Sequence, residues 1–384
     1  MGNLKVGIAR EDITPEVGIP MDGFLVKRRY SKGVHDAIQA KAIVLGNGRK
    51  KVAIVSCDLC WLNKRMVNKT KDLIKKQTDV NDIIITVTHT HSGPSILHLL
   101  VIPTKKSVEY VKELPSRIAD VVRKACEDMK EAEIGAIKGK VNGIAKNRCI
   151  LDGTIDPELN IIYIRTLADD LRAILINYSC HPVVLGRKNR YISADFPGYC
   201  TATVEKNLGK NSVALFLNGA CGDVNPVSCK GHYCNGTFRD VKQIGSKLAK
   251  EALRIISKVK CISDFDINIL TKKIKFQSIN PIFEREIEVK ILTLNDIFLI
   301  GIPGELFVQT GLEIKLDSNA KHVIISCYTN GYEGYIPAQE AYRRGCYEAG
   351  LLCWLPEGAG EKIRDYIVNI IEQLHKNKAK GEKS

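Results

Sequence analysis

Apolar runs typical of buried strands alternate with amphipathic stretches typical of helices along the whole chain. Short apolar runs closed by polar residues predict strands, whereas apolar residues recurring with a period of about 3.6 predict helices. We expect the helix at 108–132 to be broken or kinked at Pro115, and the run at 287–304 to be a hairpin that turns at Asn295 and Asp296. The remaining expected strands are 51–58, 82–88, 134–145, 160–167, 172–180 and 212–219, and the remaining expected helices are 63–78, 196–208, 240–258, 305–317 and 359–375.

This alternation continues without an internal repeat or a low-complexity linker. It predicts the α/β class, with a layered mixed β-sheet core flanked by helices. No stretch rich in proline and glycine marks a boundary, so we expect one domain over residues 1–384. The basic end of the chain, residues 376–384, is expected to be a flexible tail.

Polar residues with metal-binding or catalytic chemistry follow directly after four of the apolar runs. They are His89 and His91, His181, Asp223, and Glu305. In open α/β sheets, ligands bind beyond the carboxyl ends of the strands. These four strand ends are therefore candidates to converge on one site.

The histidines and the glutamate would form a metal site if they meet. In an extended backbone, His89 and His91 would point to the same side. Two histidines and one glutamate, with a position left for water, are a known catalytic zinc pattern, and redox-active iron uses a similar set. Each residue also has an ordinary interpretation: the His89 pair as polar loop residues, His181 as a satisfied core histidine, and Glu305 as a first-turn residue of a helix.

The formal net charge of +14 does not by itself indicate a partner, because lysine and arginine are spread along the chain. No nucleic-acid-binding motif accompanies the charge, so we do not expect a nucleic-acid partner. Contact with an anionic membrane surface remains open. No apolar run approaches the length of a membrane span, and the first residues lack a secretory pattern. We expect a cytoplasmic protein; the oligomeric state is not determined by these patterns.

The 13 cysteines lie mostly within apolar runs, as small buried residues do in a reducing compartment. The pair Cys57 and Cys60, and the group Cys229, His232 and Cys234, have spacings seen in metal sites and disulfides. Nothing in the sequence ties these groups together, so we expect neither a structural metal nor a disulfide there. We also do not expect Cys180 or Cys221, each beside a motif, to be a nucleophile.

Nine segments taken together resemble the neutral/alkaline, non-lysosomal ceramidase family, over nearly the whole chain and in the family's order. One such segment alone would be weak evidence. The segments are VGIAREDITP near the start, GVHDAIQAKAIVL (33–45), THTHSGP (88–94), KNRC…DPELNIIYIR (146–165), NYSCHPVVLG (177–186), ISADFPGY (192–199), FLNGACGDVNP (216–226), PGELF (303–307) and NGYEGYIPAQEAY…YEAG (330–350).

The resemblance implies a zinc-dependent hydrolase that cleaves the amide bond of an N-acyl, lipid-like substrate. The implied zinc ligands are His89, His181, Glu305 and Tyr335, three of which the strand-end argument had already selected. The resemblance also implies an active-site tyrosine, at the position of Tyr347, and an arginine, at the position of Arg148. We expect His91 to transfer a proton to the leaving amine, and Tyr347 and Arg148 to donate to the developing oxyanion. Asp58 and Asp195 either orient ligand imidazoles or satisfy backbone donors.

The chain departs from the family at several positions. Asn225 stands where the family has a serine important for activity, and asparagine can donate a hydrogen bond but cannot act as a nucleophile. Cys149 likewise replaces a serine after Arg148. The family's C-terminal immunoglobulin-like domain is not expected, and Arg343 and Arg344 are expected to face solvent rather than an anionic substrate group.

These departures leave two further hypotheses beside the amidase. One is a zinc hydrolase or lyase acting on another small molecule, such as a carbohydrate derivative. The other is a binding protein without catalytic activity, which the retained His89, His181, Glu305 and Tyr335 make the weakest of the three. A long apolar channel above the metal would favour an acyl chain, and a shallow polar bowl would favour a sugar or an amino acid.

Overall fold

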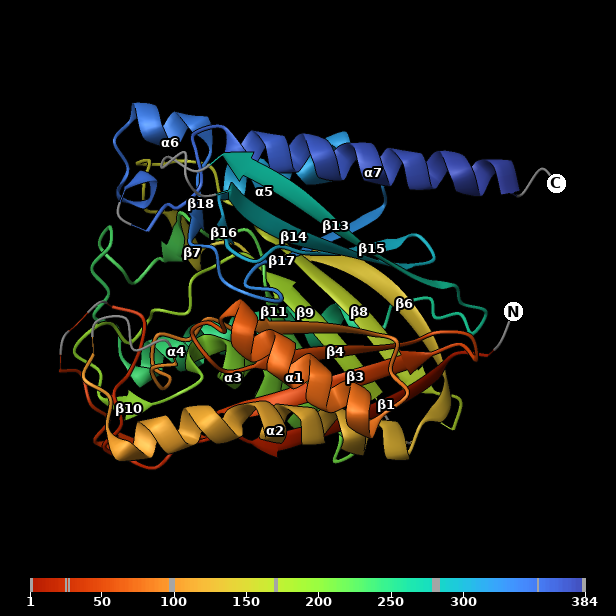
Figure 1. The fold of residues 1–384 in the computed structure, drawn as a ribbon, viewed down its shortest axis with the longest axis horizontal. Coiled ribbons are helices and arrows are strands. Elements are labelled where there is room, and N and C mark those ends of the chain that lie inside the picture. Colours follow the sequence, from red (N-terminus) through yellow and green to blue (C-terminus); the bar gives the residue numbers. More distant parts are fainter. Residues whose placement is uncertain are drawn as a thin grey trace.

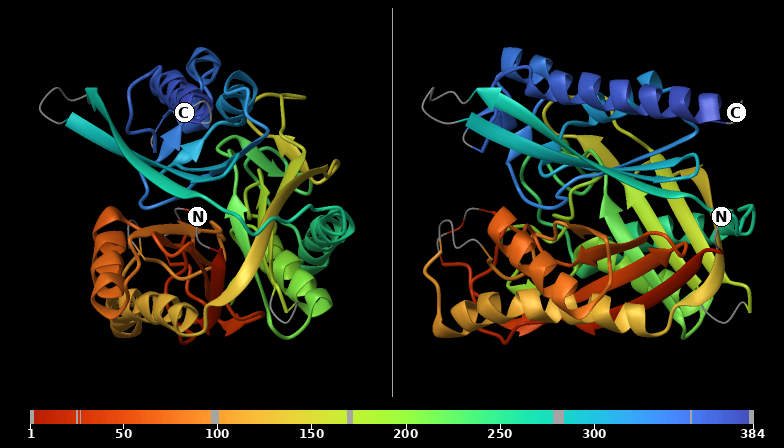
Figure 2. Two further views of the ribbon diagram at one scale, coloured as in Figure 1. Left: turned by 90° about the vertical axis from the view of Figure 1, so that its right-hand side faces the viewer. Right: turned by 45° about the vertical axis from the view of Figure 1, so that its right-hand side comes forward.

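Two stacked β-sheets form the centre of the protein, and helices cover both outer faces (Figures 1 and 2). The computed structural model describes residues 3–24, 26, 28–96, 101–168, 172–277, 284–350 and 352–381. The larger sheet has eight strands in the order β11-β9-β8-β6-β1-β3-β4-β5. These strands are β1 (Lys5–Asp12), β3 (Gln39–Gly46), β4 (Lys51–Cys57), β5 (Asp82–Val87), β6 (Lys130–Lys140), β8 (Glu158–Thr166), β9 (Arg172–Tyr178) and β11 (Ser212–Asn218).

The smaller sheet has four strands in the order β13-β14-β15-β17. They are β13 (Ile267–Gln277), β14 (Glu284–Leu294), β15 (Ile297–Gly301) and β17 (His322–Ser326). A buried aliphatic core joins the two sheets, with residues such as Ile54 and Ile162 from the larger sheet and Leu292 and Leu299 from the smaller. Burial of such apolar surface stabilises a layered arrangement, because each sheet can cover one face of the other.

Helices close the two outer faces. On the larger sheet, α2 (Lys105–Glu127) packs on β1 and β3, with α1 (Lys64–Gln77) beside it, and α3 (Asp195–Leu208) and α4 (Phe238–Ile256) cover the strands toward β11. On the smaller sheet, α5 (Val308–Asp317) packs against β17 and α7 (Ala359–Gly381), the long blue helix in Figure 1. The predicted α/β class with a mixed sheet flanked by helices is confirmed.

The sheets are mixed, and three strand pairs are parallel: β4 with β5, β9 with β11, and β15 with β17. The strands of a parallel pair end at the same edge of their sheet. Each of the predicted strand-end residues follows one of these pairs, His89 after β5, His181 after β9, and Glu305 after β15.

Parallel pairing alone does not bring these ends together, because five antiparallel steps separate β9 from β4 and β15 belongs to the smaller sheet. Packing between the strands does: Asn218 at the end of β11 donates to the carbonyl oxygen of Thr88, and Thr86 of β5 donates to that of Cys327, which follows β17.

Several predicted boundaries are wrong, and tertiary packing explains them. Helix α2 continues through Pro115, because Leu114, Ile118 and other residues of its apolar face are buried and their packing outweighs one missing hydrogen bond. Residues 130–132, predicted as helix, begin strand β6, where Ala132 pairs with Thr166. Helix α5 begins at Val308 rather than at residue 305, and helix α7 runs to Gly381, into the segment predicted to be a flexible tail.

The cysteines also differ from the prediction. Two disulfides are present, Cys149–Cys346 and Cys229–Cys234, where we expected only reduced thiols. The sequence spacing of Cys229 and Cys234 was therefore a real signal, whereas Cys149 and Cys346 are 197 residues apart and only the fold brings them together. The nine remaining cysteines, including Cys57, Cys60, Cys180 and Cys221, are free. Among the described residues, no helix has both the length and the apolar character that crossing a membrane requires.

Candidate active site

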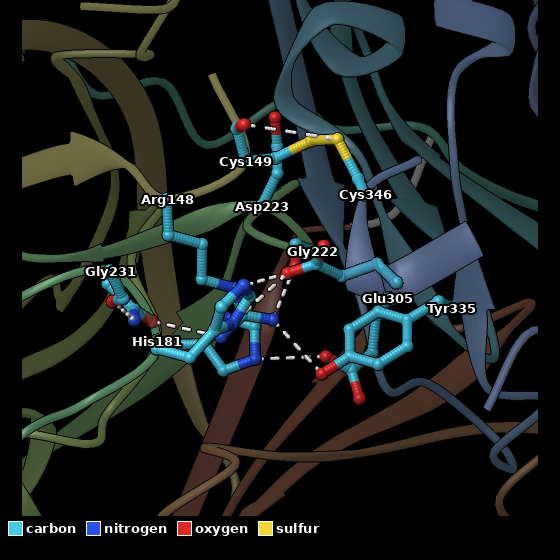
Figure 3. Close-up of polar contacts among 12 residues, drawn as sticks. Arg148, Cys149, His181, Gly222, Asp223, Gly231, Glu305, Tyr335 and Cys346 are labelled. Carbon is cyan, nitrogen blue, oxygen red and sulfur yellow. Dashed lines mark hydrogen bonds and ion pairs between the residues drawn. A yellow bond between two sulfur atoms is a disulfide. The ribbon is translucent and has the colours of Figure 1, made fainter. Parts of the chain in front are cut away.

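His89, His181 and Glu305 meet in the interior, where their ligand atoms all lie within 4.8 Å of one another. The distance between His181 Nε2 and Glu305 Oε2 is 2.9 Å, and that between His89 Nε2 and the same oxygen is 3.8 Å. All three side chains are fully buried. Figure 3 shows His181 and Glu305 approaching from elements that are far apart in sequence.

The protons of both imidazoles are directed away from this cluster. His89 Nδ1 lies 2.7 Å from the carbonyl oxygen of Cys60, and His181 Nδ1 lies 2.6 Å from that of Cys221. A carbonyl oxygen can only accept, so each Nδ1 carries the proton and each Nε2 presents a lone pair to Glu305. Burial lowers the pKa of His89 to about 3 and that of His181 well below its ordinary value, which keeps both rings neutral.

Two ring-nitrogen lone pairs and a carboxylate thus face one another without a proton between them. Such a set is unfavourable without a cation and is a suitable ligand set for a divalent metal ion. The residues present therefore fit a metal. A second group with metal-binding spacing, Cys60, His89 and His91, shares His89 with the first. Burial raises the pKa of the Cys60 thiol well above its ordinary value, which disfavours the thiolate that a metal binds.

The backbone at His89 is left-handed, with φ of 67°. The premise that His89 and His91 lie in extended chain is therefore wrong, because the strand ends at Val87. The two rings nevertheless meet, with 3.0 Å between their Nε2 atoms. A left-handed conformation is uncommon for a residue other than glycine and is found preferentially at functional sites.

His91 borders the cavity above the cluster and packs closely on Gly23. Gly23 has φ of 108°, and a Cβ there would lie 2.4 Å from the His91 ring, so only glycine fits. His91 thus lies between the cavity and the candidate metal site, with its ring held in one orientation by Gly23.

Glu305 is held by a small parallel sheet and by two tyrosines. It lies in β16 (Glu305–Leu306), where its register partner is Tyr335 of β18 (Tyr335–Ile336), so the two predicted ligands are neighbours. Tyr332 donates to Glu305 Oε1 at 2.6 Å, and Tyr328 donates to Oε2 at 3.4 Å. Sequence reasoning missed both tyrosines, although they lie in the segment after β17 that also supplies Tyr335.

Arg148 borders the cavity and contacts Tyr335 beside the cluster (Figure 3). Its guanidinium donates to Glu348 Oε1 at 2.7 Å, to Asn225 Oδ1 at 3.0 Å and to the Tyr335 hydroxyl at 3.0 Å, and also to the carbonyl oxygen of Gly222 at 2.8 Å. Burial alone would lower the pKa of Arg148, but its interactions with Tyr335, Glu348 and Glu305 outweigh burial and raise it. Glu348, fully buried, was also missed.

Two further predicted residues contribute to the same cavity in different ways. Asn225 accepts from Arg148, and its Nδ2 donates to the carbonyl oxygen of Gly231 at 2.9 Å, so it positions Arg148 and the neighbouring loop. Tyr347 lies in a short 3₁₀ helix (Tyr347–Ala349), is half-exposed, and has its ring centroid 6.4 Å from that of Tyr335.

The three aspartates considered above play structural parts. Asp58 accepts from the backbone N–H of Gln39, and Asp195 accepts from that of Phe196. Both border a separate cavity of about 630 Å³. Asp223 accepts from Val308 N–H and from Asn147, and so ties α5 to the loop of Arg148. Because backbone carbonyl groups orient the ligand imidazoles, Asp58 and Asp195 satisfy backbone donors, the second of the two alternatives.

The disulfide Cys149–Cys346 joins the segments that carry Arg148 and Tyr347. We expect the double variant Cys149→Ser/Cys346→Ser to lose about 2–4 kcal/mol in free energy of unfolding, because the bond restricts the unfolded chain. Denaturant unfolding measures this loss, and the variant Cys261→Ser, which removes a free thiol, is the control. Equal stability of the double variant and the control would contradict the prediction.

The cavity above the cluster has a volume of about 530 Å³ and a mixed lining. Volumes of this size hold small organic ligands. Its apolar and aromatic wall includes Phe24, Trp61, Val183, Tyr332 and Leu352, and its polar wall includes Arg148, Arg187, Lys188, Asn225 and His232. It is neither a purely apolar channel nor a shallow polar bowl.

Comparisons with known proteins agree with this architecture. Residues 4–255 match the family model described as neutral/alkaline non-lysosomal ceramidase, N-terminal. The neutral ceramidase of Drosophila melanogaster is 26% identical over 267 residues, which cover 60% of this chain and 38% of the relative. That of Pseudomonas aeruginosa is 24% identical over 281 residues, covering 65% of this chain and 42% of the relative. The chain thus spans about two fifths of the length of these relatives.

The likeness of fold extends over nearly the whole chain. The crystal structure of the P. aeruginosa neutral ceramidase superposes with a TM-score of 0.85 at 17% identity, covering 98% of this chain and 75% of that one. A structure described as ceramidase complexed with C2 gives a TM-score of 0.84 at 17% identity, with coverages of 98% and 76%. The family model spans more than half of the chain, so the chain belongs to the neutral/alkaline non-lysosomal ceramidase family.

Proposed function

We propose that the protein is a zinc-dependent hydrolase that cleaves the amide bond of an N-acyl, lipid-like substrate. The observation that carries the proposal is the buried set of His89, His181 and Glu305, in which two imidazole lone pairs and a carboxylate converge without a proton between them. Tyr335, the register neighbour of Glu305, is the fourth proposed ligand. Family membership and the names of the relatives support the amide substrate.

When bound, a zinc ion would polarise the substrate carbonyl and lower the pKa of a water molecule. The other steps belong to side chains of the protein. The neutral His91 imidazole, beside the cluster, can take up the proton that the attacking water releases and pass it to the leaving nitrogen. Tyr347, half-exposed at the cavity, can donate to the oxygen on which negative charge develops. Arg148 donates to the Tyr335 hydroxyl and borders the same cavity, so its positive charge can stabilise the developing negative charge.

Asn225 restricts the mechanism. Its amide oxygen accepts from Arg148 and its amide nitrogen donates to Gly231, and an amide side chain cannot form an acyl intermediate. We therefore propose direct attack by water rather than a covalent acyl-enzyme. Asn225 then contributes by positioning Arg148.

The activity can be tested with purified protein on two series of substrates, N-acyl sphingosines and simpler N-acyl amines. We expect equimolar release of fatty acid and amine, zinc at one equivalent per chain, and loss of turnover after treatment with a chelator. Restoration of turnover by added zinc is the control for the chelator.

Two outcomes would redirect the assignment. Stoichiometric zinc without turnover of any acyl amide would favour the alternative of a zinc hydrolase or lyase acting on another small molecule. Absence of both bound metal and turnover would favour a binding protein. Metal content and turnover are both measured on the same preparation, so the two outcomes can be distinguished directly.

A further inference from the structure

We propose that the substrate carries an anionic group, a carboxylate, sulfonate or phosphate, which Arg187 and Lys188 bind at the wall of the active-site cavity. This inference rests on the proposed amide hydrolysis and narrows its substrate class. It places the acyl chain against the aromatic wall and the charged group against the two cations.

The first support is that Arg187 and Lys188 have no acidic partner among the described residues. Both side chains are exposed, and both border the cavity that contains Glu305. Arg187 lies 5.9 Å from the centroid of the Tyr233 ring, and within the described part of the chain neither cation forms an ion pair with a carboxylate. Their charges are therefore available to a ligand.

Three other arginines on neighbouring segments are already paired with carboxylates. Arg148 is paired with Glu348, and Arg343 and Arg344 of α6 (Gln339–Arg343) and its C-cap are exposed and paired with Glu340. The expectation that Arg343 and Arg344 face solvent agrees with this position. Arg187 and Lys188 thus differ from these residues in being unpaired cations at the cavity itself.

The second support is the composition of the loops that form this wall. The residues of these loops that border the cavity are Val183, Arg187, Lys188, Asn225 and 232–235, which include two cations and no aspartate or glutamate. Among the residues that the structure describes, Glu305, a proposed metal ligand, is the one carboxylate that borders the cavity. A cleft lined by charge of one sign concentrates counter-ions, so the wall favours an anion over a neutral head group.

The third support is that the loop carrying the cations is held in place. Strand β10 (Tyr191–Ile192) pairs with β2 (Gly33–Val34), and Arg190 donates to the carbonyl oxygen of Tyr30 at 2.8 Å. The buried Arg29 donates to the carbonyl oxygens of Asn189 at 3.0 Å and of His91 at 2.7 Å. One arginine thus links the cationic loop to the metal-binding segment, which orders the two charges relative to the reaction centre.

Matched substrates test the inference. N-dodecanoyl taurine, N-dodecanoyl glycine and N-dodecanoyl phosphoethanolamine carry a sulfonate, a carboxylate and a phosphate, and N-dodecanoyl ethanolamine is the neutral reference. We expect the wild type to have a higher kcat/KM for at least one anionic substrate than for the reference. In the variant Arg187→Ala/Lys188→Ala, the ratio of anionic to neutral kcat/KM should fall about tenfold, mostly through KM, as expected for the loss of two partly exposed charge interactions.

The matched control is Lys75→Ala/Lys76→Ala, which removes two exposed lysines at the end of α1. This control should leave the ratio of anionic to neutral kcat/KM unchanged. It thereby distinguishes a general effect of net charge from a local effect of Arg187 and Lys188. Raising the salt concentration should lower the wild-type ratio and have a smaller effect on the variant. Equal turnover of anionic and neutral substrates by the wild type, or an equal ratio in both variants, would overturn the inference while leaving the amidase function intact.

Ligand binding tests the inference even if no amide is hydrolysed. Trp61, one of two tryptophans, borders the cavity, so binding of N-dodecanoyl taurine or N-dodecanoyl ethanolamine below the micellar concentration can be followed by its fluorescence. We expect the taurine compound to bind more tightly, and this preference to be lost in Arg187→Ala/Lys188→Ala. Equal affinity for both compounds would overturn the inference, and absence of turnover together with this preference would refute only the amidase proposal.

Discussion

The variant His181→Ala is expected to lose its bound metal and at least about a thousandfold of its rate of amide hydrolysis, or about 4 kcal/mol of transition-state stabilisation. His181 provides one of the two converging imidazole nitrogens, and its Nδ1 is fixed by the carbonyl oxygen of Cys221. Without the His181 ring, Glu305 and His89 remain as an incomplete set of metal ligands. The measurements are the metal content per chain and the steady-state kinetics of hydrolysis.

Loss of metal has to be distinguished from loss of fold, because His181 is fully buried. The variant Glu305→Gln retains the volume of the side chain and removes only the charge, and it should lose metal with a smaller loss of thermal stability. His322→Ala, which removes a half-buried histidine at the start of β17, is the control and should retain both metal and activity. Full metal content in His181→Ala would contradict the proposed ligand set.

The residues of the candidate site were predictable because each of them follows a strand. His89, His181 and Glu305 were selected as the residues that follow apolar runs, and packing among β5, β11 and β17 brings those strand ends together. The local chain geometry was not predictable in the same way. The left-handed backbone at His89 depends on its hydrogen bond to Cys60 and on packing that no local pattern shows.

The residues that contact Glu305 and Arg148 were missed for a related reason. Tyr332 and Glu348 contact Glu305 and Arg148 across sequence separations of 27 and 200 residues. In the sequence each resembles an ordinary loop residue, because its contact partner is brought close only by the folded chain. Strands β13 and β17 of the smaller sheet were also missed, since the charged positions of β13 and the shortness of β17 give weak strand signals.

The choice between the two hypotheses for Asp58 and Asp195 shows the same limit. A carboxylate near a ligand histidine often orients the imidazole, and the sequence permitted that interpretation. In this fold the chain itself orients the rings, since the carbonyl groups of Cys60 and Cys221 accept from the two Nδ1 atoms. Only coordinates distinguish a carboxylate that faces the ring from one that faces the backbone.

The variant Arg148→Ala is expected to lose about a hundredfold to a thousandfold in kcat, the range found when a donor to a developing oxyanion is removed. Arg148 holds the Tyr335 hydroxyl and places its charge at the cavity. The variant should also lose about 3–5 kcal/mol in free energy of unfolding, because the buried Glu348 would lose its arginine partner and keep only the more distant His232, at 3.6 Å.

The two effects can be separated with Glu348. In Glu348→Gln, the amide oxygen can still accept from Arg148 Nε, so that kcat should fall by less than about tenfold. In the double variant Arg148→Ala/Glu348→Gln, stability should recover relative to Arg148→Ala, whereas kcat should stay low, because removal of the buried charge does not restore the donor. Free guanidine should partly restore kcat in Arg148→Ala.

The control for a general effect of losing an arginine is Arg165→Ala, which removes a half-exposed side chain paired with Glu133 on the larger sheet. It should change stability by less than about 1 kcal/mol and leave kcat unchanged. If the double variant recovered both stability and kcat, Arg148 would act only by neutralising Glu348. A positive charge at that position would then be dispensable for the reaction, and the donor to the developing negative charge would have to be Tyr347 alone.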